Sequence, residues 1–369
     1  MDILISTAEL RAAISRTTGI VEAKATMPIL GCVLLEAEVT PAGGRLHVRA
    51  YDLEVGLISS HPCEVKKPGV LAVPAKALLD VCKVAPESVT RLKGMANNRL
   101  EVTSGGATFR LAGHAGDDFP AIPGVEGLEF WSFDRETMAV SIGKVAFSIS
   151  NDPTRYNLNG ILFTPVGEGM DLVATDGHRL AKTTVNGPNP LKEGVIVSSK
   201  AVGELSRLLK ESNAGTHEWG VKGGSLAYRR AGLTFVARLI DGTFPDYTQV
   251  VPKMDGAFAT CQRSALADVL KRVTLMTADK ASSVQMTLTD GRMDLTSRNP
   301  DVGDASDCVN IDYSGPELKL NLNGRYLLEM LASVEEPVIQ IHIEGDTSPV
   351  CIRPVNDQAH VAVIMPMRA

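Results

Sequence analysis

The sequence repeats the same landmarks three times, at intervals of about 125 residues. Similar apolar segments lie at 28–35, 157–163 and 283–289. Tripeptides related to Ala-Tyr-Asp lie at 50–52, 174–176 and, more weakly, 297–299. The Asp-Phe-Pro of 118–120 also returns as the Thr-Phe-Pro of 243–245. A repeat of this length is a whole domain, so we expect three tandem domains, at residues 1–126, 127–254 and 255–369.

Each repeat is expected to hold two helices among short antiparallel strands. The first helix of each repeat should begin near Thr7, Asp134 and Arg263. The second helix follows a short strand and carries a cation at one equivalent position, which is Lys76, Lys200 or Arg325. Alternating runs with turn residues, such as 44–50, are typical of antiparallel strands. The predicted fold class is α+β: three copies of a domain with two helices packed on antiparallel sheets.

Composition excludes several classes of protein. The first ten residues carry acids and only a short apolar run, unlike a signal peptide, and no apolar stretch approaches the ~18 residues of a membrane span. The six cysteines lie far apart with no Cys-x-x-Cys pair, which argues against a zinc site or a redox motif. We therefore expect a cytoplasmic protein with reduced thiols, no metal and no cofactor.

The expected helices are the basic part of an acidic chain. The formal net charge is −6, which by itself disfavours nucleic-acid binding. The six helical segments nevertheless sum to +5, which leaves −11 for the remaining residues. If the helices share one face, that face attracts phosphates while the rest of the surface repels them. The candidate DNA contacts on these helices are Lys76, Lys200, Arg207, Lys210, Lys271, Arg272 and Arg325. The alternative is that these cations only solvate helix surfaces.

The sharpest local motif is Val-Ala-Thr-Asp-Gly-His-Arg-Leu-Ala at 173–181. Its Asp176-Gly177 step suits a tight turn between strands. Asp176 and His178 could by their chemistry act as an acid and a base in a hydrolase. However, the chain has no Gly-x-Ser-x-Gly, no His-Glu-x-x-His and no phosphate-binding loop motif, so nothing supplies a nucleophile. We therefore expect a protein that is not an enzyme.

This motif closely resembles the signature of the bacterial DNA polymerase III beta subunit family, the sliding clamps. Further matching segments lie, in the family's order, at 26–30, 155–160, 236–247, 313–315 and 363–368. Together they cover the whole chain. The resemblance implies a head-to-tail homodimer whose six similar domains close a ring around duplex DNA, with helices lining the hole. It also implies weak, sequence-independent DNA contacts, to which Lys24 would add one from a loop.

The resemblance further implies a groove that binds short peptide segments of the polymerase alpha subunit, the clamp loader and other clamp-binding proteins. The matching groove positions are Arg155, Leu158, Thr175, Gly177, His178, Arg179, Leu180, Pro245, Val250, Asn323, Tyr326, Val363, Ile364, Met365, Pro366, Met367 and Arg368. Leu180, Pro245 and Val250 are apolar enough to form a floor, and methionine adapts its shape to different ligands. Without the resemblance, Met365 and Met367 read as core residues or as a frayed terminus.

The seam between two subunits is expected at an edge strand of the first domain. Phe109 and Leu111 match that strand, and Leu275 and Met276 match the third-domain surface that it meets. An exposed Phe/Leu edge would invite aggregation unless a partner strand covers it. The alternative is that Phe109 and Leu111 face the core of their own domain.

Three groove positions and one short segment depart from the family pattern. Gln249 stands where members often have Arg, Ala281 where some have a large aromatic residue, and Ala369 where a larger aliphatic residue is usual. Lys24-Ala25-Thr26 replaces the more usual Arg-Asn-Thr. The first three shrink or neutralise the edge of the groove. The alternative function is therefore a divergent clamp that serves as a specialised or drug-tolerant partner-binding protein.

Overall fold

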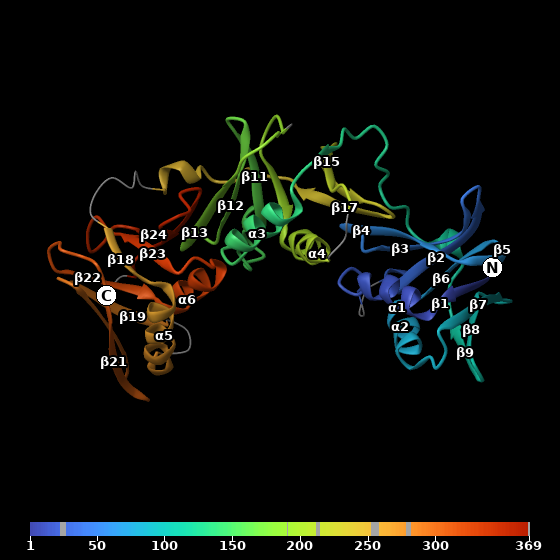
Figure 1. The fold of residues 1–369 in the computed structure, drawn as a ribbon, viewed down its shortest axis with the longest axis horizontal. Helices are drawn as coiled ribbons and strands as arrows, with labels where there is room; N and C mark the ends of the chain where they lie inside the picture. Colours follow the sequence, from blue (N-terminus) through green and yellow to red (C-terminus); the bar gives the residue numbers. More distant parts are fainter. Residues whose placement is uncertain (23–26, 190, 212–214, 252–257, 278–281, 368–369) are drawn as a thin grey trace. The chain divides into compact units, whose positions relative to one another are not determined.

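The computed structural model describes all residues except 23–26, 190, 212–214, 252–257, 278–281 and 368–369. The described residues include two helices in each repeat, and the first helix of each repeat begins 128 residues after its predecessor (Figure 1). The helices are α1 (Thr7–Arg16), α2 (Ala75–Val84), α3 (Arg135–Ala146), α4 (Ser199–Lys210), α5 (Arg263–Val273) and α6 (Gly324–Ser333).

The chain divides into two compact units, each made of two stretches of sequence. Unit 1 comprises Met1–Phe133 and Gly203–Leu239, and unit 2 comprises Asp134–Val202 and Ile240–Ala369. The stretches interleave because strands from consecutive repeats pair with one another inside each unit.

Unit 1 contains two antiparallel sheets. The smaller sheet has, in spatial order, β5 (Glu64–Lys67), β1 (Asp2–Ser6), β7 (Val89–Met95), β8 (Arg99–Ser104) and β9 (Ala107–Ala112). The larger has β10 (Trp131–Ser132), β15 (Glu218–Lys222), β16 (Ser225–Arg230), β17 (Leu233–Ile240), β4 (Val55–Pro62), β3 (Gly43–Tyr51), β2 (Cys32–Thr40) and β6 (Gly69–Pro74). The pairing of β17 with β4 joins the second repeat to the first.

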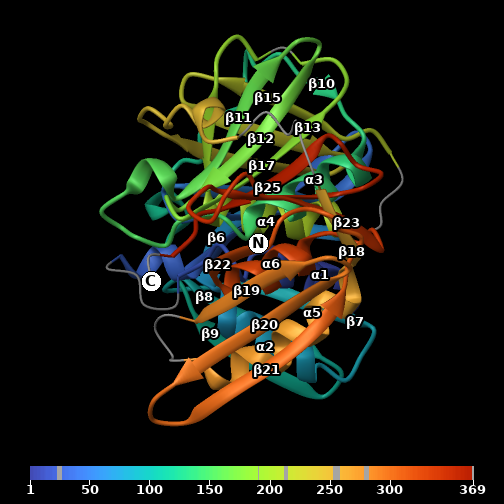
Figure 2. The ribbon, with the colours of Figure 1, turned by 90° about the vertical axis from the view of Figure 1, so that its left-hand side faces the viewer.

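Unit 2 is built in the same way. Its larger sheet has β18 (Phe258–Gln262), β23 (Val338–His342), β24 (Val350–Pro354), β25 (His360–Ile364), β13 (Arg179–Val185), β12 (Gly169–Thr175), β11 (Gly160–Val166) and β14 (Val195–Ser198). Its smaller sheet has β21 (Gly303–Asn310), β20 (Arg292–Asn299), β19 (Ser283–Thr289) and β22 (Leu318–Asn323), with β19, β20 and β21 side by side in Figure 2. The pairing of β25 with β13 joins the third repeat to the second.

The helices form where the sequence predicts them, and α1, α2, α3, α5 and α6 each pack against strands. The Ser6 hydroxyl accepts a hydrogen bond from the amide of Glu9, and Asp134 caps α3 through the amide of Thr137. Leu10 and Ile14, one turn apart on α1, are both fully buried. Burial of each such side chain contributes roughly 1.5–3 kcal/mol. The apolar faces of the helices therefore hold them on their sheets.

The structure gives the state of the cysteine side chains and the character of the helices. The six cysteines are free thiols, and burial raises the pKa of Cys32 and of Cys82 to about 11. Over the ranges that the structure describes, none of the helices combines the length and the apolar character needed to cross a bilayer.

Candidate functional site

The motif at 173–181 folds into a tight turn that the Asp176 carboxylate closes. Its Oδ1 atom accepts hydrogen bonds from the amides of His178 (2.9 Å) and Arg179 (3.0 Å). Gly177 lies in the left-handed region with φ 87°, which a residue without Cβ adopts at no steric cost. The Thr175 hydroxyl donates to the carbonyl of Arg179 at 2.6 Å and accepts from the amide of Gly177 at 3.1 Å. The Asp176 carboxylate therefore serves to hold the turn closed.

Arg179 anchors this turn to the third repeat. Its Nε donates to Asp176 Oδ2 at 3.0 Å, and its NH1 donates to Glu329 Oε2 on α6 at 2.5 Å. The guanidinium also lies 4.2 Å from the ring centroid of Tyr326 and 5.3 Å from that of Phe147. The side chain is only 9% exposed, so the ion pairs are well shielded from solvent. Burial opposes the ionisation of Glu329, but the hydrogen bonds from Arg325 and Arg179 together hold the pKa of that carboxyl below its usual value.

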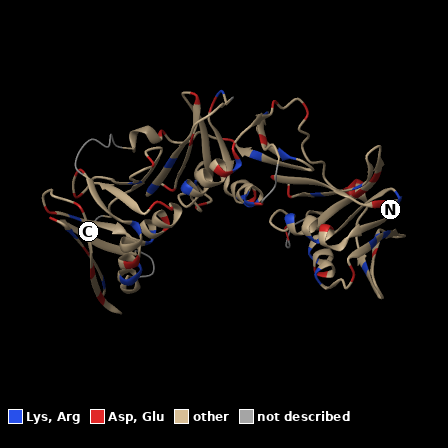
Figure 3. Cartoon of the chain, viewed as in Figure 1, with Lys and Arg blue, Asp and Glu red and all other residues tan. Residues whose placement is uncertain are grey.

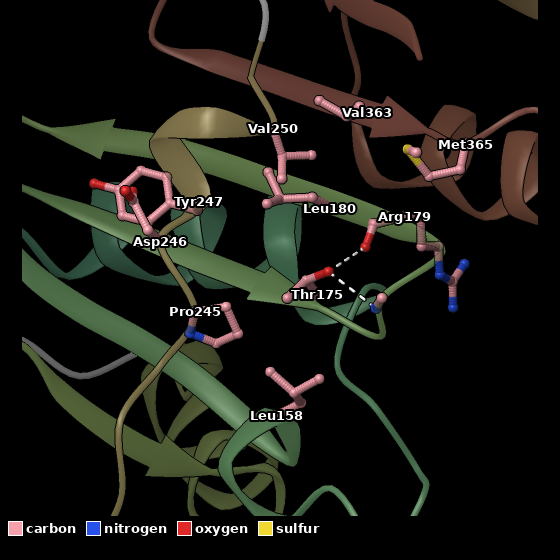
Figure 4. A pocket seen from close by; sticks show the side chains of 11 residues that line it. Leu158, Thr175, Arg179, Leu180, Pro245, Asp246, Tyr247, Val250, Val363 and Met365 are labelled. Carbon is pink, nitrogen blue, oxygen red and sulfur yellow. Dashed lines mark hydrogen bonds between the residues drawn. The ribbon is translucent and has the colours of Figure 1, made fainter. Parts of the chain in front are cut away.

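Next to the turn lies an apolar pocket of about 190 Å³. Figure 4 shows Leu158, Pro245, Leu180 and Val250 around this space, while the Arg179 guanidinium points away from it. The full lining is Leu158, Thr175, Gly177, Arg179, Leu180, Pro245, Asp246, Tyr247, Val250, Val363 and Met365. Pockets that enclose drug-sized ligands usually measure about 300–1,000 Å³. A pocket of this size suits one or two apolar side chains of a larger partner.

One wall of the pocket is a short 3₁₀ helix, Tyr247–Gln249, held by two aspartates. The Tyr247 hydroxyl donates to Asp171 Oδ2 at 2.9 Å, and burial beside that carboxylate raises the pKa of Tyr247. Asp246 Oδ1 accepts from the amide and the hydroxyl of Thr248, and its Oδ2 accepts from the Gln249 amide nitrogen at 2.8 Å. These bonds lower the pKa of Asp246, with the Thr248 hydroxyl as the first cause. Asp246 and Tyr247 therefore belong to the pocket wall, although the sequence did not single them out as site residues.

Seven of the eight predicted DNA contacts lie on helices that also carry acids, as Figure 3 shows. Lys76 and Lys210 are exposed and, among the described residues, form no ion pair. Four others have acidic partners: Arg207 pairs with Glu204, Lys271 with Asp268, Arg272 with Asp307, and Arg325 with Glu329. Lys200 is half-buried, and Lys24 lies outside the described residues. Each paired cation has to share its charge with a neighbouring carboxylate, so its attraction for phosphate is reduced.

Strand β9 is an edge of the smaller sheet of unit 1, as the sequence predicts. Phe109 and Leu111 are half-buried and pair with the core residues Val102 and Leu100, so they extend the core face of their own sheet to its edge. Leu275, in the 3₁₀ helix Thr274–Met276 after α5, is 73% exposed, and Met276 beside it is half-buried. An apolar edge and an exposed leucine are features that a partner surface commonly covers.

Comparison with known proteins accounts for the whole chain. Models of the DNA polymerase III beta subunit match its N-terminal domain at residues 1–123, its central domain at 132–246 and its C-terminal domain at 248–368. The chain belongs to the DNA polymerase III beta subunit family. The beta sliding clamp of Caulobacter vibrioides is 31% identical over the full length of both chains, and that of Escherichia coli K12 is 30% identical over 96% of each.

Solved structures of beta subunits agree. A sliding clamp from Bartonella birtlesii, bound to griselimycin, covers both chains completely with a TM-score of 0.94 at 30% identity. The Pseudomonas aeruginosa beta subunit also covers both chains completely, with a TM-score of 0.93 at 28% identity. The predicted α+β fold with three tandem clamp domains is thus confirmed, and so is a non-catalytic processivity subunit.

Nine of the predicted groove positions line the pocket. The Arg155 guanidinium reaches the carbonyl of Asp176 at 3.3 Å, and the His178 carbonyl accepts from the amide of Met365 at 2.9 Å. Asn323 caps α6, and Ile364 is fully buried in the β13–β25 pairing. Tyr326 lies under Arg179, Pro366 and Met367 follow β25, and Arg368 lies outside the described residues.

Two site residues could have been found by closer reading of the sequence. Asp246 and Tyr247 directly follow Pro245 in a segment that already carried the family resemblance. An Asp two residues before a Thr is a common side-chain turn, which would have indicated that Asp246 shapes the backbone there.

Proposed function

We propose that this clamp tethers partner proteins to DNA through the pocket beside Asp176. The observation that carries the proposal is the pocket itself: its apolar lining comes from the turn, from Pro245–Val250 and from the C-terminal segment around Met365. A partner would insert apolar side chains of a short linear segment between Leu180 and Val250. The polymerase alpha subunit, the clamp loader and other proteins with such segments are the proposed occupants.

Retention on DNA would depend on ring closure rather than on affinity. Two copies are proposed to close head to tail, with domains at 1–126, 127–254 and 255–369, around duplex DNA in the cytoplasm. Exposed helix cations such as Lys76 and Lys210 give weak phosphate contacts that read no bases. The remaining proposed contacts are Lys24, Lys200, Arg207, Lys271, Arg272 and Arg325. Pairing of several of these cations with carboxylates favours a contact loose enough to slide.

The seam is proposed to join β9 of one copy to β21 of the other. Each is an edge strand of its sheet, so each presents unpaired backbone groups. Within the chain, β17 pairs with β4 and β25 pairs with β13, and β9 and β21 are the equivalent strands that remain. Phe109 and Leu111 would then meet Leu275 and Met276.

Gln249 favours a second candidate, a clamp with altered partner choice. Its neutral amide contacts Asp246 where an arginine would add a positive charge at the rim of the pocket. Ala281 and Ala369, the two other groove departures, lie outside the described residues. A partner with an acidic flank would bind such a rim less tightly, while the apolar contacts would persist.

The test is titration of a fluorescent peptide of the type Gln-Leu-x-Leu-Phe. We expect saturation at one peptide per chain and loss of binding in Leu180→Asp and in a variant that lacks 365–369. The matched control is Leu53→Asp, which changes an exposed leucine in the equivalent turn of the first repeat and should bind as the parent does. No binding by the intact dimer would contradict the general tethering role and favour the specialised clamp.

A further inference from the structure

Two ion pairs inside the chain occupy equivalent positions in consecutive repeats. In unit 1, Arg16 Nε donates to both carboxylate oxygens of Glu211, at 3.2 and 3.1 Å. Arg16 is the tenth residue of α1, and Glu211 lies twelve positions beyond Ser199, the first residue of α4. The pair thus joins the end of a first helix to the end of the second helix of the next repeat.

In unit 2 the same pair recurs with lysine. Lys144 is the tenth residue of α3, and Glu336 lies twelve positions beyond Gly324, the first residue of α6. Lys144 Nζ lies 3.4 Å from Glu336 Oε1 and 2.5 Å from Asp357 Oδ2. Burial opposes the charge of Lys144, but the Asp357 and Glu336 carboxylates keep its pKa above the usual value.

One cation and one acid at the equivalent positions remain, and among the described residues they do not form this ion pair with each other. The tenth residue of α5 is Arg272, and the residue twelve positions beyond Ala75, the first of α2, is Glu87. Both are exposed. Among the described residues, the Glu87 side chain forms no hydrogen bond or ion pair, and Arg272 contacts only Asp307.

Each internal ion pair accompanies a strand pairing between repeats. Arg16–Glu211 accompanies β4·β17, and Lys144–Glu336 accompanies β13·β25. The three strands β4, β13 and β21 begin 124 residues apart, at Val55, Arg179 and Gly303. The third strand pairing requires a second copy, and so does the third ion pair.

We propose that Arg272 of one protomer forms an ion pair with Glu87 of the partner subunit across each seam. The inference rests on the proposed function, because it needs the head-to-tail dimer. Arg272 is then assigned to the seam between protomers instead of to the DNA contacts. Glu87 takes a role that its sequence context did not suggest.

The surroundings of both side chains fit this role. The Glu87 amide donates to the Ser104 hydroxyl at 3.1 Å, and the Glu87 carbonyl accepts from Thr7 Oγ1 at 2.7 Å, so the backbone that carries the acid is fixed. Ser104 ends β8 as Arg230 ends β16. Arg230 donates to the Glu211 carboxylate, whereas Ser104 contacts the backbone of Glu87 and leaves its carboxylate to another partner. Arg272 gives only its Nε to Asp307, which leaves the other N–H donors of the guanidinium for a second carboxylate.

The experiment is a charge swap read out as the dissociation constant of the dimer. Arg272→Glu alone and Glu87→Arg alone place like charges at both seams of a ring. We expect each to raise the Kd about ten-fold or more, because a ring contains two copies of the pair. Combining both changes in one chain should return the Kd to within about three-fold of the parent.

Mixing the two single variants gives a sharper result. A heterodimer of the Arg272→Glu chain with the Glu87→Arg chain has opposite charges at both seams, whereas either homodimer has like charges. With one chain tagged, native mass spectrometry should find heterodimers well above the one-half expected from random pairing. Lys271→Glu, which changes the neighbouring cation on α5, is the control and should leave the Kd within about two-fold of the parent.

The outcomes distinguish a failure of the proposed ion pair from a failure of the proposed function. Random pairing in the mixture, with no recovery in the double variant, would overturn the proposed ion pair while the parent remains dimeric. A monomeric parent would instead overturn the proposed function. A DNA role for Arg272 predicts that Arg272→Glu weakens DNA retention without any rescue by Glu87→Arg, and that result would also reject the proposal.

Discussion

The first and second repeats contain the same aspartate-closed turn, but the described residues pack apolar side chains beside the first turn and line a pocket beside the second. Asp52 Oδ1 accepts from the amides of Glu54 and Val55 at 2.9 and 2.6 Å, as Asp176 does from His178 and Arg179. Leu53, with φ 78°, takes the left-handed position that Gly177 takes in the second repeat. The backbone is thus the same in both copies.

The side chains around the two turns differ in bulk. Tyr51, in the place of Thr175, packs with Phe119 and Ile122 into an apolar cluster of the first repeat. Gly56 stands where the second repeat has Leu180, and a Cβ there would lie 2.7 Å from Ile122 Cγ2. In the first repeat, side chains of the same repeat fill the space beside the turn. In the second repeat, the corresponding space is a pocket with an apolar lining. The same turn is therefore packed by its own repeat in one copy and lies beside an open pocket in the other, where we propose that a peptide binds.

The largest predicted difference is between the two units, in the pH dependence of their stability. β25 begins with His360, whereas β17, its equivalent, begins with Leu233. Burial, with help from Lys144, lowers the pKa of His360 to about 4, while an unfolded histidine titrates near 6.5. The unfolded chain then binds the additional proton between these values, so unit 2 should lose up to about 3 kcal/mol of stability as the pH falls from 6.5 to 4.

Denaturant unfolding of the parent and of His360→Leu across this pH range measures that loss. The variant copies Leu233 of the second repeat and should show a flatter profile. Equal slopes for both proteins would mean that His360 is not the titrating group.

The next largest effect is expected at Arg179, whose counterpart in the first repeat is the buried Val55. Arg179→Val removes the partner of Asp176 and Glu329 and should cost about 2–3 kcal/mol of folding free energy. Arg155→Ala is the control, because Arg155 is exposed and its closest carboxylate lies 3.8 Å away. The measurement is the midpoint of thermal unfolding of both variants, and equal decreases in this midpoint would contradict an anchoring role for Arg179.

Filling the first repeat further should destabilise it. Gly56→Leu copies the second repeat but drives a side chain into Ile122, at a cost of about 2 kcal/mol. Urea unfolding of the variant measures this cost, and adding Ile122→Ala should recover most of the lost stability. A single variant as stable as the parent would show that the space beside Tyr51 is not filled.

The smallest effects are expected at the left-handed positions of the turns. Gly177→Ala should cost about 1 kcal/mol, and Leu53→Gly should be neutral or stabilise by about 0.5 kcal/mol, because only a residue without Cβ adopts this conformation freely. Differential scanning calorimetry of the two variants compares them directly. A destabilised Leu53→Gly would mean that packing of this 45% exposed side chain outweighs its backbone strain.

The positions of the helices and the turn motif at 173–181 could be predicted from the sequence, because both depend on local patterns. The caps at Ser6 and Asp134 and the second-residue positions of Lys76, Lys200 and Arg325 follow from spacing along the chain. The acidic partners of Arg272 and Arg179 do not, since Asp307 and Glu329 are brought near by tertiary packing. The roles of Asp246 and Tyr247 likewise depend on how their segment folds back onto β12.

The most direct test of the account is photo-crosslinking with a clamp-binding peptide that carries a photoreactive group at its terminal aromatic residue. Crosslinked positions are mapped by mass spectrometry. We expect crosslinks to the segments around Leu180, Pro245–Val250 and Met365, at one peptide per chain. Crosslinks around Tyr51 and Ile122 in the parent protein would show that the first repeat also accepts a peptide, and they would contradict the distinction between a filled and an open copy.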